Sequence, residues 1–181
     1  MSINNQKVVD LCKKQKRLVL YGDGQKQWIS DGYAMYPLLG VPTLTEDVVR
    51  ALYALPDNVE VEVKDAPGQY CYEDTIREER LTYYEKIQLR PLGAEVSTLR
   101  TQRGVVFIKE KYLKPLEAGE GGDHQLYERT DSAGRTYIVA KAGVFVEAII
   151  LPVQNLLTAG WLNDLQELIG ILRKTFEQEE E

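Results

Sequence analysis

Hydrophobic and polar positions follow one arrangement three times along this chain. At residues 4–36, 44–73 and 108–153, a short amphipathic helix precedes a tight turn and two or three strands whose apolar positions alternate. The clearest copy has an apolar helix stripe followed by an alternating strand, formed by Val48, Val49, Leu52 and Leu55 and then by Val59, Val61 and Val63. The arrangement predicts an α+β fold built from repeated helix-plus-antiparallel-strand units.

The first unit has the most definite boundaries. A helix is expected from about residue 4 to 16, capped by Asn4 or Asn5, with a buried face of Val8, Val9, Leu11 and Cys12. Three strands are expected after it, at 18–21, at 27–30 and at 33–36, the last ending at Pro37.

The later units are less regular. Strands are expected at 59–63 and 69–73, and residues 81–89 favour a strand over a frayed helix because aromatic and β-branched residues hold the apolar positions. Residues 93–104 are expected to cross the surface. A strand at 105–108, a short helix at 109–116, two strands on either side of residues 131–134 and a last strand at 144–153 complete the third unit.

The end of the chain differs from the rest, which suggests a domain at 1–153 and a separate tail at 154–181. The tail has one continuous apolar helical face, Trp161, Leu162, Leu165, Leu168, Ile169, Leu172 and Phe176. Such a stripe either docks on its own domain or pairs with a partner helix, so it is a candidate for self-association or for holding another protein.

Composition narrows the class of protein. The chain has 181 residues, 44% hydrophobic and 28% charged, with a formal net charge of −6 and only two cysteines. Two unpaired thiols suit a reducing compartment. The chain has no apolar run near the 20 or so residues that a membrane helix needs, and its first residues are polar. These features predict a cytoplasmic protein without membrane contact. An acidic chain argues against general nucleic-acid affinity but permits a local basic face.

The residues that usually carry catalysis are scarce. His124 lies in a glycine-rich loop and is expected at the surface, and no cysteine, histidine and carboxylate spacing matches a metal site. Asp31 with Gly32 is interpreted as turn chemistry, and Glu73, Asp74, Glu78 and Glu79 as a charged loop. The expectation is a protein without enzymatic activity and without a cofactor.

Four segments together resemble the DNA sliding clamp, especially the bacterial β clamp. They are residues 44–63 (LTEDVVRALYALPDNVEVEV), 27–32 (QWISDG), 107–116 (FIKEKYLKPL) and 148–153 (AIILPV). The resemblance implies a sheet backed by helices that line a hole around DNA. The resemblance covers about two-thirds of the chain. Two features differ from the family: a clamp ring needs about six such domains, and the family has no counterpart of the tail helix.

A clamp contacts phosphates without reading bases, so its hole-facing helices need cations. The candidates for DNA contact are Lys13, Lys14, Lys16, Arg17, Lys109, Lys111 and Lys114, with Lys7 on the same first helix. A solvated helix face would explain these clusters as well. The leading hypothesis is a non-catalytic, clamp-like accessory or assembly module in phage or mobile-element DNA metabolism, and the alternative is a protein interaction module without a DNA role.

Overall fold

The computed structural model describes residues 3–22, 26–89, 95–116 and 124–153. Within these ranges the chain forms two α-helices, a short 3-10 helix and two β-sheets. The protein is therefore of mixed α and β structure with strand as the main component, as the alternating pattern predicts. The tail, with Trp161, Leu165, Leu168, Leu172 and Phe176, lies outside the described residues.

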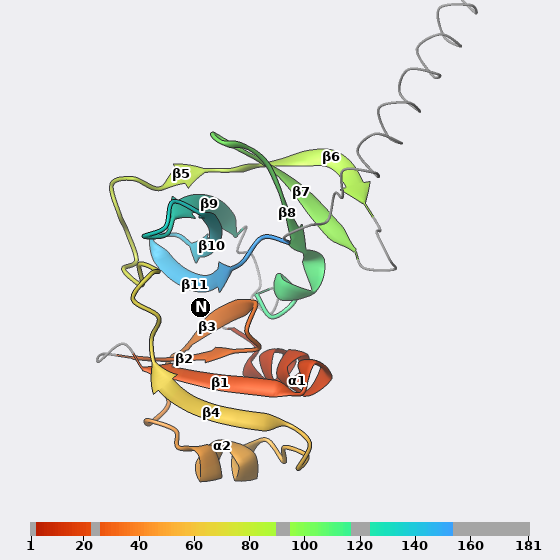
Figure 1. Cartoon of the computed structure of the whole chain (residues 1–181), viewed down its shortest axis with the longest axis vertical. Coiled ribbons are helices and arrows are strands. Elements are labelled where there is room, and N and C mark those ends of the chain that lie inside the picture. Colours follow the sequence, from red (N-terminus) through yellow and green to blue (C-terminus); the bar gives the residue numbers. More distant parts are fainter. Residues whose placement is uncertain (1–2, 23–25, 90–94, 117–123, 154–181) are drawn as a thin grey trace, which may run out of the picture.

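The larger sheet has eight strands, and its two ends lie at the bottom and the top of Figure 1. In spatial order the strands are β4 (Glu60–Asp65), β1 (Arg17–Gly22), β2 (Gln27–Ser30), β3 (Ala34–Leu38), β11 (Phe145–Ile150), β10 (Thr136–Ala142), β9 (Gln125–Thr130) and β5 (Arg80–Leu81). Two three-stranded meanders, β1–β3 and β9–β11, meet where β3 pairs with β11, with Met35 opposite Ile149. The pairing of β4 with β1 is parallel, while the other pairings are antiparallel.

The smaller sheet contains β6 (Tyr83–Leu89), β7 (Val96–Thr101) and β8 (Gly104–Lys109), with β7 in the middle. It lies at the upper right in Figure 1, and the 3-10 helix η2 (Glu110–Tyr112) continues from β8 toward α1 (Asn5–Gln15). After β11, Val153 N donates a 2.7 Å hydrogen bond to the carbonyl of Phe107. The end of β11 is thereby tied to β8.

The first helix forms as its sequence predicts. Asn4 is the N-cap, and its side chain accepts a 3.0 Å hydrogen bond from the backbone of Lys7. The buried face is the predicted set, Val8, Val9, Leu11 and Cys12. Lys16 ends the helix in the left-handed conformation at φ 56°.

Two hydrophobic clusters lie on opposite faces of the large sheet. One face carries Leu18, Leu20 and Ile29, which pack with the buried side of α1 and with residues of β7, β8 and η2. The other face carries Trp28 and Met35, which lie under the loop of Tyr70 and Tyr72, with the Trp28 and Tyr72 rings 5.1 Å apart between centroids. Successive side chains of a strand point to opposite faces of the sheet, so neighbouring residues such as Trp28 and Ile29 belong to different clusters.

The second predicted unit is the one that differs most from expectation. Its helix α2 (Glu46–Leu52) lies beside the edge strand β4, as Figure 1 shows, rather than over the sheet. Only Val49 of the stripe is buried in this helix, while Val48 is 47% and Leu52 59% exposed. A seven-residue helix at a sheet edge has little surface to cover, so most of the predicted stripe faces outward.

Several predicted boundaries are also wrong. Residues 69–73 form no strand but belong to the loop that covers one core, so this unit contributes only β4. Residues 93–104 were expected at the surface, yet they contain the central strand β7. The helix predicted at 109–116 forms only as η2. Strand β3 continues through Pro37, which is paired with Trp28 of β2. Pro37 lies beyond the residues that pair with β11, so its missing N–H breaks no hydrogen bond to that strand.

The strands at 81–89 and 105–108, the pair on either side of residues 131–134 and the final strand are confirmed as β6, β8, β9, β10 and β11. In the part of the chain that the structure describes, no helix is both long and apolar enough to span a bilayer.

Candidate nucleic-acid interface

Lysines from two separate parts of the chain converge on one groove. The groove has a volume of about 300 Å³, and Lys7, Lys14, Lys111 and Lys114 line it together with Asp10, Leu11 and Pro115. Two of these lysines come from α1 and two from the segment around η2. Four cations against one carboxylate make the groove locally basic, although the whole chain carries a net charge of −6.

The helical repeat explains why Lys7 and Lys14 share the groove. They are seven residues apart, which is almost two turns, so both leave the same side of α1. Leu11 lies between them on that side and is only 8% exposed, and it forms part of the apolar floor.

Hydrogen bonds hold the two walls of the groove together. Asn4 N donates to the carbonyl of Pro115 at 2.9 Å, and Lys7 Nζ donates to the carbonyl of Lys114 at 3.0 Å. On the other wall Tyr112 is buried, and its carbonyl accepts a 2.7 Å hydrogen bond from the Tyr36 hydroxyl of β3. The backbone segments that carry the lysines are therefore held side by side by the fold.

The positive charges act on one another. Burial lowers the pKa of the Lys111 ammonium below its ordinary value; the Asp31 charge opposes this, and the smaller effects of the Lys109 and Lys14 charges lower the pKa further. Ammonium groups that destabilise one another's charge are stabilised by a bound anion. Four ammonium groups on one groove have the sign of charge that attracts anions.

The six lysines and one arginine predicted for DNA contact do not all meet. Lys14, Lys111 and Lys114 line the groove, and Lys109 lies next to it with its Nζ 5.6 Å from the centroid of the Tyr33 ring. Lys13 instead donates a 2.9 Å hydrogen bond to the carbonyl of Tyr53. Lys16 is the exposed C-cap of α1, and Arg17 forms a 2.9 Å ion pair with Glu62 on β4.

A second charged cluster is buried on the opposite face of the large sheet. Arg129 is fully buried and donates to Glu79 at 2.6 and 3.0 Å and to the carbonyls of Cys71, Glu73 and Asp74. Lys141 donates to the other Glu79 oxygen at 2.6 Å. The prediction of a merely charged loop at Glu73–Glu79 missed this cluster, since its partners lie about fifty residues further along the chain.

The cluster around Arg129 has a structural role. Its hydrogen bonds join the 71–79 loop to β9 and β10, and every charge in it has an opposite partner. Burial opposes ionisation of Glu79, but the hydrogen bonds from Lys141 and Arg129 prevail and lower the pKa of its carboxyl below the ordinary value. Glu79 is held ionised by its neighbours and is no candidate for proton transfer at neutral pH.

His124 is not the free surface residue that was expected. Its Nε2 lies 2.6 Å from Oε2 of Glu147, which is only 3% exposed. Glu147 is the extra residue of a β-bulge opposite Lys141, and the bulge turns this carboxylate toward the ring. No sequence motif marks the pair, because His124 comes just before β9 whereas Glu147 is on β11.

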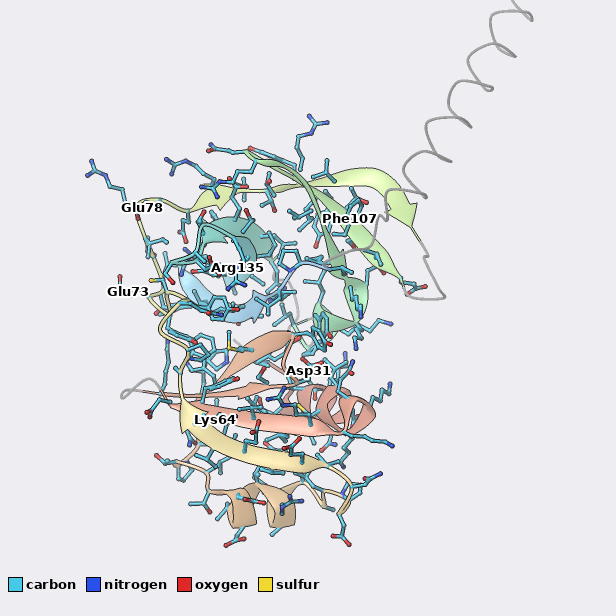
Figure 2. The ribbon with its side chains drawn as sticks, in the orientation of Figure 1. Asp31, Lys64, Glu73, Glu78, Phe107 and Arg135 are labelled. Atoms are coloured by element: carbon cyan, nitrogen blue, oxygen red, sulfur yellow. The ribbon has the colours of Figure 1, made fainter. Side chains whose placement is uncertain are left out.

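Asp31 performs the turn chemistry that its sequence predicts. Its Oδ1 accepts hydrogen bonds from the backbone of Tyr33 at 2.9 Å and of Ala34 at 3.0 Å, which starts β3, and Gly32 takes φ +95°. Figure 2 shows Asp31 beside α1. Its Oδ2 and the hydroxyl of Tyr112 are buried without hydrogen bonds, and burial together with the Asp31 charge raises the pKa of Tyr112 well above its usual range.

Among the described residues, no group of three or more histidine, cysteine or carboxylate side chains is arranged to hold a metal ion. Cys12 is buried, and burial raises the pKa of its thiol, so it is a core side chain rather than a nucleophile. Cys71 is only partly buried.

Comparison of the chain with protein-family models, with curated proteins and with solved structures gives no match. The groove of lysines is therefore interpreted from its own geometry.

Proposed function

We propose that this protein is a non-catalytic module that holds the phosphate backbone of nucleic acid in the groove between α1 and η2. The convergence of Lys7, Lys14, Lys111 and Lys114 carries the proposal. Four flexible ammonium groups attract phosphates without fixing a base sequence, so binding is weak, non-specific and sensitive to salt. The role is that of an accessory or assembly protein in DNA metabolism, in a phage or mobile element, on a clamp-like fold.

Two features support the clamp-like part of the proposal. The sheet is built from two three-stranded meanders joined edge to edge, each preceded by a helical segment, α1 or η2. The lysines of both helical segments lie on the same groove, as the resemblance requires for helices that face DNA. A ring would need several copies of this chain.

Fluorescence anisotropy with a labelled oligonucleotide tests the proposal. At about 20 mM salt the protein should bind, and the double substitution Lys111→Gln with Lys114→Gln should weaken binding at least roughly tenfold. The matched control replaces Lys16 and Lys64, which are exposed and outside the groove, by glutamine, so the net charge changes equally. No binding by the unmodified protein, or equal loss in both double variants, would contradict the proposal.

Protein interaction is the second candidate function, and exposed apolar side chains at the β4 edge favour it. Val48 and Leu52 of α2 and Val63 of β4 are 47%, 59% and 54% exposed, next to the unpaired side of the edge strand. Such positions on a sheet edge suit association with another chain. Light scattering on the unmodified protein and on Leu52→Ser tests this candidate for a second copy of the chain. If both proteins have the mass of a monomer at high concentration, self-association through this surface is contradicted.

A further inference from the structure

A small aromatic pocket lies at the cluster of Met35, on the face of the large sheet opposite to the groove of lysines, and the β2–β3 turn with Tyr33 forms its rim. It has a volume of about 190 Å³, and its lining residues are Tyr21, Ser30, Gly32, Tyr33, Met35, Pro67, Gln69, Tyr70 and Leu151. Tyr33 is 52% exposed, whereas Tyr21 and Tyr70 are partly buried. A pocket of this size with three tyrosines in its lining has room for one flat ring system and not for a base pair.

Lys109 connects this pocket to the groove. Its Nζ lies 5.6 Å from the centroid of the Tyr33 ring, and its charge is close enough to Lys111 to lower the pKa of that ammonium. Cations therefore continue from Lys14 and Lys111 to the rim of the pocket. Arg17 approaches from the other side, with Nη1 3.6 Å from the position of a Cβ on Gly32, although its charge is paired with Glu62.

The backbone fixes Tyr33 in this position. Its N–H donates to Oδ1 of Asp31 at 2.9 Å, and its carbonyl accepts a 2.9 Å hydrogen bond from Leu151 N. Both bonds fix the backbone of the turn and leave the ring accessible, since Tyr33 is 52% exposed. An accessible ring on an ordered turn can stack with a ligand.

We propose that the nucleic acid held by the lysine groove is single-stranded and that one of its unpaired bases enters the pocket and stacks on Tyr33. This inference rests on the proposed function. A basic track beside an exposed aromatic ring is the general arrangement for single-strand binding, because every base presents a flat face and sequence matters little. Bases in a duplex are already stacked and paired, so the pocket adds affinity only for a single strand.

The test compares a labelled 12-nucleotide single strand with a hairpin duplex of the same composition at about 20 mM salt. The single strand should bind at least roughly tenfold more tightly. Tyr33→Ser should reduce single-strand affinity by about 5- to 100-fold, the range expected from one stacked base, and should leave duplex affinity unchanged. Tyr33→Phe keeps the ring and should bind normally.

Tyr83→Ser is the matched control, since Tyr83 is 63% exposed on β6 and does not line the pocket. A 2-aminopurine base in the single strand gives a direct readout, because its fluorescence should fall on binding to the unmodified protein and not to Tyr33→Ser. Equal affinity for both nucleic acids, or no effect of Tyr33→Ser, overturns the single-strand inference but leaves phosphate binding intact. Failure to bind either nucleic acid overturns both proposals.

Discussion

Arg129 is the side chain on which the covering loop depends most. It is fully buried, and it joins Glu79 and three carbonyls of residues 71–74 to β9. Without Arg129, Glu79 keeps only its ion pair with Lys141, and the three loop carbonyls lose the donor that they share. The stability of the loop over Trp28 and Tyr72 should therefore follow this one guanidinium.

Arg129→Met should lower the free energy of unfolding by about 3–5 kcal/mol, because two hydrogen bonds to Glu79 and three to loop carbonyls are lost inside the protein while Lys141 still pairs with Glu79. Urea denaturation followed by tryptophan fluorescence measures the change. Arg135→Met is the control, since the Arg135 side chain is 57% exposed and Asp131 keeps hydrogen bonds from the backbone of Ala133 and of residue 135 without it. Similar midpoints for the two variants would contradict the structural role given to Arg129.

The same cluster predicts a pH dependence. The folded pKa of Glu79 lies below the ordinary value of 4.5, so the stabilisation is present above pH 4.5 and is lost as the pH falls through the lower, folded pKa. Urea midpoints measured from pH 6 to pH 2.5 should decline in the unmodified protein. The midpoints should decline less steeply in Glu79→Gln, although this variant is less stable at neutral pH. If the two proteins give parallel curves of midpoint against pH, other carboxylates determine the loss of stability in acid.

At the scale of secondary structure, the sequence predicts elements well where periodicity and burial agree. For α1, four apolar positions at helical spacing form the buried face, and Asn4 is the cap. For β7 the signal was missed, because Ser97 and Thr98 interrupt the apolar pattern although both are buried. The β-branched residues Val96, Thr98 and Thr101 were the available indication of a strand.

The β2–β3 hairpin gives a direct test at this scale. Ile29 is fully buried between β2 and α1, so Ile29→Ala should destabilise the protein by about 2–5 kcal/mol through lost burial and a residual cavity. Asp31→Ala should destabilise it less. It removes two hydrogen bonds of roughly 1 kcal/mol each, but it also removes Oδ2, a buried oxygen without a partner.

Chemical denaturation of both variants checks this ranking. Val63→Ala is the control, since Val63 is 54% exposed on the edge strand β4. A larger loss for Asp31→Ala than for Ile29→Ala would mean that the turn, rather than the core, determines the stability of this hairpin.

At the scale of the whole molecule, the candidate site was predictable only in part. The sequence marks two basic segments, at 13–17 and 109–114, but side chains in each segment point in different directions. Lys14 turns to the groove while Lys13 reaches Tyr53, because neighbours on a helix are about 100° apart. The aromatic pocket was not predictable, since its residues come from β1, the β2–β3 turn, the 66–70 loop and the end of β11.

The contrast between an acidic chain and a basic groove leads to a prediction about salt. The net charge of −6 repels nucleic acid from most of the surface, so productive contact should be confined to the groove and its few cations. Four lysines neutralising four phosphates of a single strand give a slope of about −3 for log affinity against log salt concentration. A protein that is basic overall would give a much steeper dependence.

Anisotropy titrations between about 20 and 150 mM salt measure this slope. Lys111→Gln should make it shallower by about 0.7, the contribution of one phosphate contact on a single strand, and Lys16→Gln should leave it unchanged. Because Lys16 and Lys111 carry the same charge, only their position relative to the groove distinguishes the two variants. A slope that changes equally in both would indicate attraction to the whole surface, and a slope near zero would indicate that the groove binds something other than a polyanion.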